Sequence, residues 1–137
     1  MTVSDLEPLY KLLSNSKAMQ YLEAPYTKEQ AEQFLFQSGL SETPLIYAVE
    51  KDNDLIGYMI YHDYDSESVE IGRVLEPSFW GGGIASYLTS EMMTKARNSG
   101  KQVVIECVPE QKSSIRIAEK YGFQKCGIID GLMIYRL

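Results

Sequence analysis

Histidine, cysteine and tryptophan are scarce in this chain, and the shortage excludes several classes of functional site. The single histidine, His62, cannot build the histidine-rich sites that hold zinc or haem, so we expect no metal. The two cysteines, Cys107 and Cys126, lack the spacing of a redox pair or a zinc ribbon. The favoured interpretation is two reduced thiols in a cytoplasmic protein.

Long apolar runs are also missing. No stretch approaches the roughly 18 consecutive apolar residues that cross a membrane, so we expect no membrane partner. The N-terminus has no basic segment followed by an apolar run, and we therefore expect no signal peptide. The 137 residues are 45% hydrophobic and 23% charged, an ordinary globular balance, and this length predicts a single domain over residues 1–137.

Positive charge is in deficit overall, but unevenly along the chain. The formal net charge of −6 argues against nucleic acid as a partner. Residues 1–76 hold 14 acidic and 5 basic side chains, a net charge of −9, whereas residues 77–137 hold 5 acidic and 8 basic ones, a net charge of +3. If one cleft draws on both halves, the second half suits an anion and the first a cation. The alternative is that most of these charges are simply solvated.

The spacing of apolar residues predicts a mixed α/β domain. Capping-box patterns at Ser4-x-x-Glu7 and Thr27-x-x-Gln30 indicate the starts of two helices. The expected order is α-α-β-β-β-α-β-α-β-β, with a sheet that is antiparallel at first and then contains one β-α-β crossover. After the first two helices the expected elements are strands Leu45–Glu50, Leu55–Tyr64 and Val69–Leu75, helix Ile84–Asn98, strand Val103–Val108, helix Lys112–Tyr121, and strands Phe123–Ile128 and Leu132–Arg136.

The most informative segment is Val69–Ser86, where a strand runs into three glycines and a helix starts at once. Three glycines at such a junction indicate backbone that bends sharply or approaches another group closely. The first turn of a helix leaves its N–H groups unpaired, and bare glycines leave them open to a phosphate. A flexible turn is the alternative. The segment is neither a Walker loop nor a dinucleotide fingerprint, because G-K-[ST] and G-x-G-x-x-G are both absent.

Two blocks of sequence, in this order, carry a family resemblance. The first is EIGRVLEPSFWGGGIAS at residues 70–86, in which E-I-G-x-x-L-x-P leads into W-G-x-G-x-A. The second is PEQKSSIR at residues 109–116, ahead of a helix that ends in G-F at residues 122–123. With these blocks and their spacing the chain resembles the GNAT superfamily of N-acetyltransferases, in the branch similar to ribosomal-protein-alanine acetyltransferases (RimJ/RimL-like).

This resemblance implies a fold and an acyl donor. The fold is a central mixed β-sheet flanked by helices, here with the first edge strand missing or very short. The donor is acetyl-CoA, whose pyrophosphate the glycine-loop N–H groups would hold. Its pantetheine arm would lie between the strand that ends at Leu75 and the strand that starts at Val103. The implied cofactor-binding residues are Val74, Leu75, Trp80, Gly81, Gly82, Gly83, Ile84, Ala85, Ser86, Gln111 and Ser114.

Acetyl transfer to an amine needs a proton acceptor and a proton donor. Glu70 is the predicted acceptor, because a carboxylate in a partly apolar cleft can have a raised pKa and act as a base. The alternative is a strand carboxylate that merely pairs with a neighbour such as Arg73. Many members of the family place a general-acid tyrosine where this chain has Ala118. Ser114 and Tyr121 are therefore the predicted substitutes for that catalytic role.

The acceptor site is expected in the acidic first half of the chain. Its predicted substrate-binding residues are Tyr21, Glu23, Tyr26, Tyr61 and Asp63. The function that follows is an N-acetyltransferase in which a primary amine attacks acetyl-CoA directly in a ternary complex. The amine would be a protein N-terminus, a polyamine or another small cationic amine, and the enzyme a monomer or homodimer. The alternative is a catalytically weak or inactive CoA-binding module that acts as a sensor or partner domain.

Overall fold

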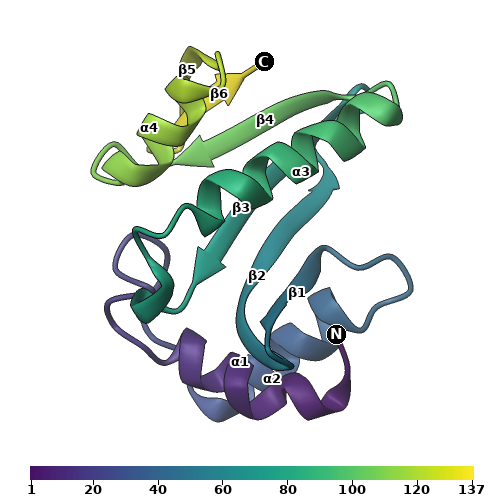
Figure 1. Ribbon diagram of the computed structural model, residues 1–137, viewed down its shortest axis with the longest axis vertical. Coiled ribbons are helices and arrows are strands. Elements are labelled where there is room, and N and C mark those ends of the chain that lie inside the picture. Colours follow the sequence, from purple (N-terminus) through teal and green to yellow (C-terminus); the bar gives the residue numbers. More distant parts are fainter. The chain divides into compact units, whose positions relative to one another are not determined.

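The computed structural model describes residues 1–137 and has the expected order of elements (Figure 1). Two helices precede three strands, and a helix, a strand, a helix and a two-stranded hairpin follow, so the expected α-α-β-β-β-α-β-α-β-β order is confirmed. No strand precedes the first helix. The helices and strands are α1 (Leu6–Leu13), α2 (Lys28–Phe34), β1 (Ile46–Lys51), β2 (Asp54–Asp63), β3 (Ser68–Leu75), α3 (Ile84–Asn98), β4 (Gln102–Cys107), α4 (Lys112–Lys120), β5 (Gln124–Ile129) and β6 (Leu132–Arg136).

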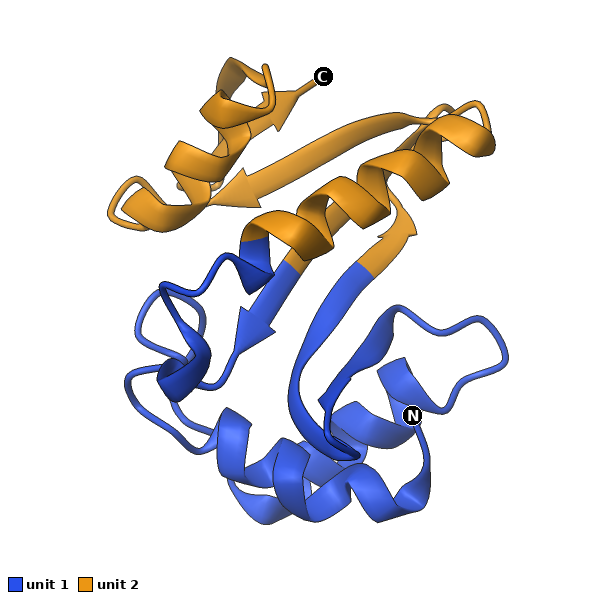
Figure 2. Cartoon of the chain, viewed as in Figure 1, with its two compact units in different colours: residues 1–60, 73–85 blue, residues 61–72, 86–137 orange.

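The strands form one mixed sheet in the order β1-β2-β3-β4-β6-β5, which confirms the expected α/β class. Contacts within the chain define two compact units, coloured separately in Figure 2. The first comprises residues 1–60 and 73–85, and the second comprises residues 61–72 and 86–137. None of the helices combines the length and the apolar character that crossing a membrane requires.

In the first unit, α1 and α2 contribute their apolar faces to a core shared with β1, β2 and the end of β3. Leu9, Leu12 and Leu13 of α1 are at most 1% exposed, as expected for residues that recur on one helical face. Thr27 and Gln30 form the expected capping box at the start of α2, with each side chain accepting the other residue's backbone N–H. The buried core residues are Leu9, Leu12, Leu13, Met19, Ala31, Leu35, Ile46, Tyr58 and Val74.

The first helical segment begins earlier than the sequence pattern indicates. A capping box at Ser4-x-x-Glu7 is wrong, because the chain already turns at the 3₁₀ segment Val3–Asp5. The Asp5 carboxylate accepts the Thr2 backbone N–H at 2.8 Å, which satisfies a donor at the start of that turn. In the pattern Thr2-x-x-Asp5, aspartate takes the place that glutamate has in the usual capping box. This pattern overlaps Ser4-x-x-Glu7 and begins before it.

Gly57 marks a close approach between two strands of the first unit. A Cβ atom added at this glycine would lie 2.2 Å from the carbonyl oxygen of Val74 in β3. Any other residue would therefore force β2 and β3 apart at this point. Gly57 thus fixes the position of the segment Val74–Leu75, which ends β3.

In the second unit, β4 lies between β3 and β6. It pairs in parallel with β3, where Ser68–Glu70 face Gln102–Val104, and antiparallel with β6 along its later part. The helix α3 makes the β-α-β crossover, and its predicted apolar face is buried at Leu88, Met92 and Ala96. Hairpin β5–β6 turns at Asp130–Gly131 with φ of 52° and 81°, as a tight primed turn requires.

Candidate functional site

The glycine loop of the first unit leaves its backbone uncovered. Gly81 and Gly83 have φ of 78° and 85°, a region that other residues rarely adopt, so the loop needs glycine at both positions. A Cβ atom added at Gly81, Gly82 or Gly83 would have no other heavy atom within 4 Å. Helix α3 begins directly after them at Ile84, with the unpaired N–H groups and partial positive charge of a helix start. Together these features can hold a phosphate group.

Trp80 anchors the glycine loop to the end of β3. Its indole Nε1–H donates to the Leu75 carbonyl oxygen at 3.0 Å, and the Lys17 ammonium lies 5.3 Å from the ring centroid. Val74 and Leu75 are themselves buried. Three of the predicted cofactor-binding residues, Val74, Leu75 and Trp80, thus lie close together in the first unit. The indole N–H of Trp80 bonds to Leu75, and one face of its ring contacts Lys17.

The first turn of α3 within the second unit carries a cluster of three polar side chains. The Tyr121 hydroxyl donates to the Ser86 carbonyl oxygen at 3.0 Å and lies 2.8 Å from the Ser86 hydroxyl. The Lys120 ammonium donates to the same Ser86 hydroxyl at 2.9 Å. The structure therefore brings two predicted residues, Ser86 and Tyr121, into contact. It adds Lys120, which sequence reasoning missed because the end of α4 and the start of α3 are far apart in the sequence.

The remaining residues of the second sequence block lie on α4. Ser114 is buried in the first turn of this helix, one turn before the fully buried Ala118. Gln111 is the N-cap residue of this helix: its carbonyl oxygen accepts the Ile115 N–H at 3.3 Å, its own N–H donates to the Val108 carbonyl oxygen at 3.0 Å, and its side chain makes no capping hydrogen bond. The cofactor-binding roles of Gln111 and Ser114, and the catalytic roles of Ser114 and Tyr121, stay predictions.

Glu70 lies in a cluster of titratable side chains in the second unit. Its carboxylate is 3.9 Å from His62 Nε2 on β2, and it hydrogen-bonds to the Glu106 carboxyl group on β4. Burial raises the pKa of the Glu70 carboxyl, the negative charge of Glu106 raises it further, and His62 opposes this. Tyr64 hydrogen-bonds to Glu106, and burial together with the charge of Glu106 raises the Tyr64 pKa. Glu106 is a residue that sequence reasoning missed.

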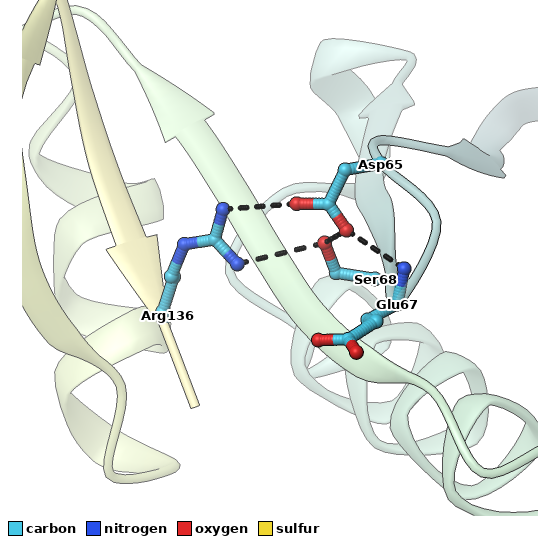
Figure 3. Close-up of polar contacts among 4 residues, drawn as sticks. All are labelled: Asp65, Glu67, Ser68 and Arg136. Carbon is cyan, nitrogen blue, oxygen red and sulfur yellow. Dashed lines mark hydrogen bonds and ion pairs between the residues drawn. The ribbon is translucent and has the colours of Figure 1, made fainter.

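Beside this cluster, Asp65 is held in its charged form. Arg136 on β6 reaches across β4 to the Asp65 carboxylate at 3.3 Å and to the Ser68 hydroxyl at 3.5 Å (Figure 3). The Asp65 carboxylate also accepts the Ser68 hydroxyl at 2.6 Å and the backbone N–H of Glu67 at 2.9 Å. These hydrogen bonds, that of Ser68 above all, lower the pKa of Asp65 from 3.8 to about 2.

Two of the three predicted acceptor-site residues of the first unit, Glu23 and Tyr26, are in contact. The Tyr26 hydroxyl donates to the Glu23 carboxylate at 2.8 Å, while Tyr21 is exposed. Burial, reinforced by Glu23, raises the pKa of Tyr26 to about 12, so its hydroxyl stays protonated and polar. The Tyr26 ring packs edge-on against Phe34.

The predicted acceptor-site residues of the second unit lie away from Glu70. The Lys95 ammonium of α3 lies 4.6 Å from the ring centroid of Tyr61, so this tyrosine is on the face of the sheet toward α3. Successive side chains of a strand alternate between faces, so His62, and with it Glu70, belongs to the opposite face. Asp63 shares the face of Tyr61 by the same rule and is exposed. A substrate contact at Tyr61 or Asp63 would thus come from the other side of β2, and it stays a prediction.

The structure groups no three histidine, cysteine, aspartate or glutamate side chains as the ligands of a metal ion would be grouped. The two cysteines are unpaired thiols, Cys107 buried and Cys126 exposed.

Comparison with known proteins points to one family. A family model described as an acetyltransferase (GNAT) domain matches residues 1–124. Over 138 aligned residues the chain is 25% identical to YwnH of Bacillus subtilis (strain 168), provisionally named a phosphinothricin acetyltransferase; the match covers 93% of this chain and 83% of YwnH.

Solved structures share the fold over the whole chain. A GNAT-family acetyltransferase from Bacillus anthracis superposes with a TM-score of 0.87 at 22% identity, and the match covers 100% of this chain and 90% of that one. RimL, a ribosomal L7/L12 alpha-N-protein acetyltransferase solved in complex with coenzyme A, superposes with a TM-score of 0.81 at 22% identity and the same coverage. These likenesses establish the central mixed sheet flanked by helices as the fold of this chain.

Proposed function

The chain belongs to the GNAT family of acetyltransferases, and we propose that it acetylates a primary amine by direct attack on acetyl-CoA in a ternary complex. Like the other members of this family, it is an acetyl-CoA-dependent N-acetyltransferase. Our proposal concerns the identity of the acceptor amine. We propose a protein N-terminus, a polyamine or another small cationic amine. We also propose that residues 1–137 work as a single domain, monomeric or homodimeric, in the cytoplasm, where unpaired thiols such as Cys107 and Cys126 persist.

One observation carries the proposal: the uncovered glycine backbone in front of α3. The space around Gly81–Gly83 is free of other protein atoms for at least 4 Å from an added Cβ, which leaves room for a diphosphate. Its N–H groups supply donors without side chains, and the start of a helix favours negative charge. In the second unit, the Lys120 ammonium at Ser86 adds a cation at the first turn of the same helix. We therefore assign pyrophosphate binding to residues 81–86.

The chemistry assigned to the other residues follows from the proton balance. Acetyl-CoA supplies the acetyl group as a thioester. The amine nitrogen forms a bond to the acetyl carbon, the carbon–sulfur bond breaks, and its electron pair leaves with sulfur. Glu70 accepts the proton that the nitrogen loses, and a proton returns to sulfur to give the free thiol. The raised pKa of Glu70 makes it a stronger base than an ordinary carboxylate.

We propose Tyr121 and Ser114 as the two hydroxyl groups that can return a proton to sulfur. Tyr121 donates its proton to the Ser86 carbonyl oxygen, so acting as a general acid requires that this hydrogen bond be exchanged for one to sulfur. The variant Tyr121→Phe distinguishes between the two candidate proton donors, because it removes the Tyr121 hydroxyl and leaves that of Ser114 in place.

A cationic acceptor is supported by the charge of the chain. Residues 1–76 carry a net charge of −9. The Glu23 carboxylate, with Tyr26 bonded to it, offers acceptor oxygens at the surface of the first unit. RimL, whose fold this chain shares, is described as acting on a protein N-terminus. A positively charged amine is therefore the acceptor class that we propose first.

The decisive experiment places a charge in the glycine loop. At Gly82 an added side chain meets no other atom within 4 Å, and φ lies outside the left-handed region, so a substitution there leaves the backbone unstrained. Gly82→Glu brings a carboxylate to the proposed diphosphate, while Gly82→Gln brings the same bulk without charge. We expect Gly82→Glu to weaken acetyl-CoA binding roughly tenfold more than Gly82→Gln, since about 1.4 kcal/mol of repulsion is worth a factor of ten.

Turnover is measured by release of free thiol with three kinds of amine: a peptide N-terminus, spermidine and an aminoglycoside. Glu70→Gln is expected to lower kcat by roughly 10²- to 10⁴-fold with acetyl-CoA binding retained. Equal affinities in Gly82→Glu and Gly82→Gln would remove the proposed pyrophosphate site. Tight cofactor binding with no thiol release from any amine would contradict the proposed acceptors and favour a binding module.

A further inference from the structure

Two carboxyl groups meet at the end of the parallel ladder in the second unit. Glu70 of β3 faces Val104 of β4, and this is the last pair of the ladder. Glu106 lies two residues beyond Val104, so its side chain is on the same face of the sheet as that of Glu70. The two carboxyl groups hydrogen-bond to each other. The pairing of β3 with β4 therefore places these two glutamates on one face of the sheet.

A hydrogen bond between two carboxyl groups requires a proton on one of them. Ionised carboxylates only accept hydrogen bonds, so one member of the pair must carry the proton that the other accepts. Removing this last proton leaves two negative charges side by side, which costs free energy in a half-buried site. The pair therefore loses its two protons in two separate steps.

Two groups face the pair from β2 and from the residue that follows it. The His62 ring nitrogen lies 3.9 Å from Glu70 and opposes the rise in its pKa, and the hydroxyl of Tyr64, directly after β2, bonds to Glu106. Arg136 from β6 lies over the Tyr64 ring, but its guanidinium is paired with Asp65. The Arg136 guanidinium is thus already matched by an anion, and a shared proton relieves the repulsion between the two carboxyl groups.

We propose that Glu106 is a positioning residue for acetyl transfer, which shares one proton with Glu70 and so sets the pH range in which Glu70 works as a base. This inference rests on the proposed function of Glu70. Glu106 acts through Glu70 and has no contact of its own with the reacting atoms. Without its charge, Glu70 would be a more ordinary and therefore weaker base.

The proton balance of the pair is complete without another reactant. Before attack both carboxyl groups are ionised, and their repulsion makes Glu70 a stronger base. When Glu70 takes the proton from the amine nitrogen, the pair shares that one proton and keeps a single negative charge. The proton then leaves to water, and the pair regains its two charges.

The test replaces Glu106 by glutamine, which keeps the size and a hydrogen-bonding group but removes the charge. The Glu70 carboxyl is titrated by ¹³C NMR in the wild type and in Glu106→Gln, with Glu70→Gln used to assign its signal. We expect the Glu70 midpoint to fall in Glu106→Gln, because no second negative charge opposes ionisation. The acid limb of kcat/KM should move to lower pH with it.

The kinetic constants separate this role from a structural one. At alkaline pH kcat should fall roughly threefold to tenfold, as expected of a weaker base. KM for acetyl-CoA should change less than about twofold, because uniform binding is untouched. The matched control is Glu91→Gln, an exposed glutamate of α3 in the same unit, which should leave both the titration and the pH profile unchanged.

Two results would overturn the inference. The first is a Glu70 midpoint that is the same in the wild type and in Glu106→Gln. The second is a midpoint that moves while the acid limb stays in place. A wild type that acetylates no amine would instead remove the proposed function. The titration is independent of turnover and would still decide whether the two carboxyl groups share a proton.

Discussion

Gly57→Ala tests the close approach of two strands in the first unit. The new Cβ atom would lie 2.2 Å from the Val74 carbonyl oxygen, 2.8 Å from Leu75 Cδ2 and 3.0 Å from Leu75 Cα. Two of these three atoms belong to the backbone, so a change of rotamer cannot relieve the overlap. Real Cβ atoms are essentially never closer than 3.0 Å to such an atom, so the strands must separate by about 0.8 Å.

The size of the effect follows from the cost of forcing extra atoms into a packed site. Such overpacking typically lowers the free energy of unfolding by about 1–3 kcal/mol. In a chain of this length, each kcal/mol lowers Tm by roughly 3–5 °C, so Tm should fall by about 3–15 °C. The displaced segment Val74–Leu75 is also the predicted pantetheine contact. The variant should therefore bind acetyl-CoA more weakly than the wild type at a temperature where both are folded.

Thermal and urea unfolding, followed by circular dichroism, measure this effect. Gly82→Ala is the matched control, because a Cβ atom there meets nothing within 4 Å. Its free energy of unfolding should stay within about 0.5 kcal/mol of the wild type. If Gly57→Ala were as stable as Gly82→Ala, β2 and β3 would not approach as closely as described, and the placement of Val74–Leu75 would be wrong.

Three further changes address the charge networks and the core. The wild type should lose stability relative to Asp65→Asn as pH falls from about 4 to about 2. The pKa of Asp65 is about 2 in the folded chain against an ordinary value of 3.8, so its stabilising charge is lost over this range. Urea midpoints at several pH values measure the loss, and parallel curves for the two proteins would contradict it. Lys120→Met should raise the Kd for acetyl-CoA roughly threefold to tenfold at low salt and less at high salt, measured by calorimetry; a salt-independent effect would argue against a phosphate contact. Leu9→Ala, at a fully buried position, should lower the free energy of unfolding by about 2–5 kcal/mol, and a smaller loss would mean that the core of the first unit is not packed as described.

The order of elements could be predicted because its signals are local. The enrichment in strand-forming residues from Leu55 to Tyr64, and the helical spacing from Ile84 to Asn98, each depend on neighbours within a few residues. The predicted start of the first helix at Ser4 is too late, because Thr2 and Asp5 form a competing cap. The sequence alone does not show which of the two caps forms. What local signals could not provide is that β6, and not β5, lies beside β4.

The sequence predicts only those parts of the candidate site that are continuous along the chain. The glycine loop and the start of α3 are continuous in sequence, so the loop could be recognised as open backbone. Lys120 beside Ser86 depends on how α4 packs, and no short-range pattern contains that information. Glu106 did leave a signal, since it is the one charged residue in an otherwise apolar strand. Such a residue needs a partner, and the pairing of β4 with β3 supplies Glu70.

Asp65 and Glu70 are five residues apart in one chain segment, and their surroundings move their pKa values in opposite directions. Ser68, a backbone N–H and Arg136 surround Asp65 with donors, which stabilise its charged form. Burial and the second carboxyl group of Glu106 favour the protonated form of Glu70. Environments that separate two carboxyl groups in this way also separate their roles: Asp65 stays charged and stabilises the fold, whereas Glu70, whose pKa is raised, can accept a proton. It follows that acidification should protonate Glu70, and stop its action as a base, before it protonates Asp65 and weakens the network around Arg136.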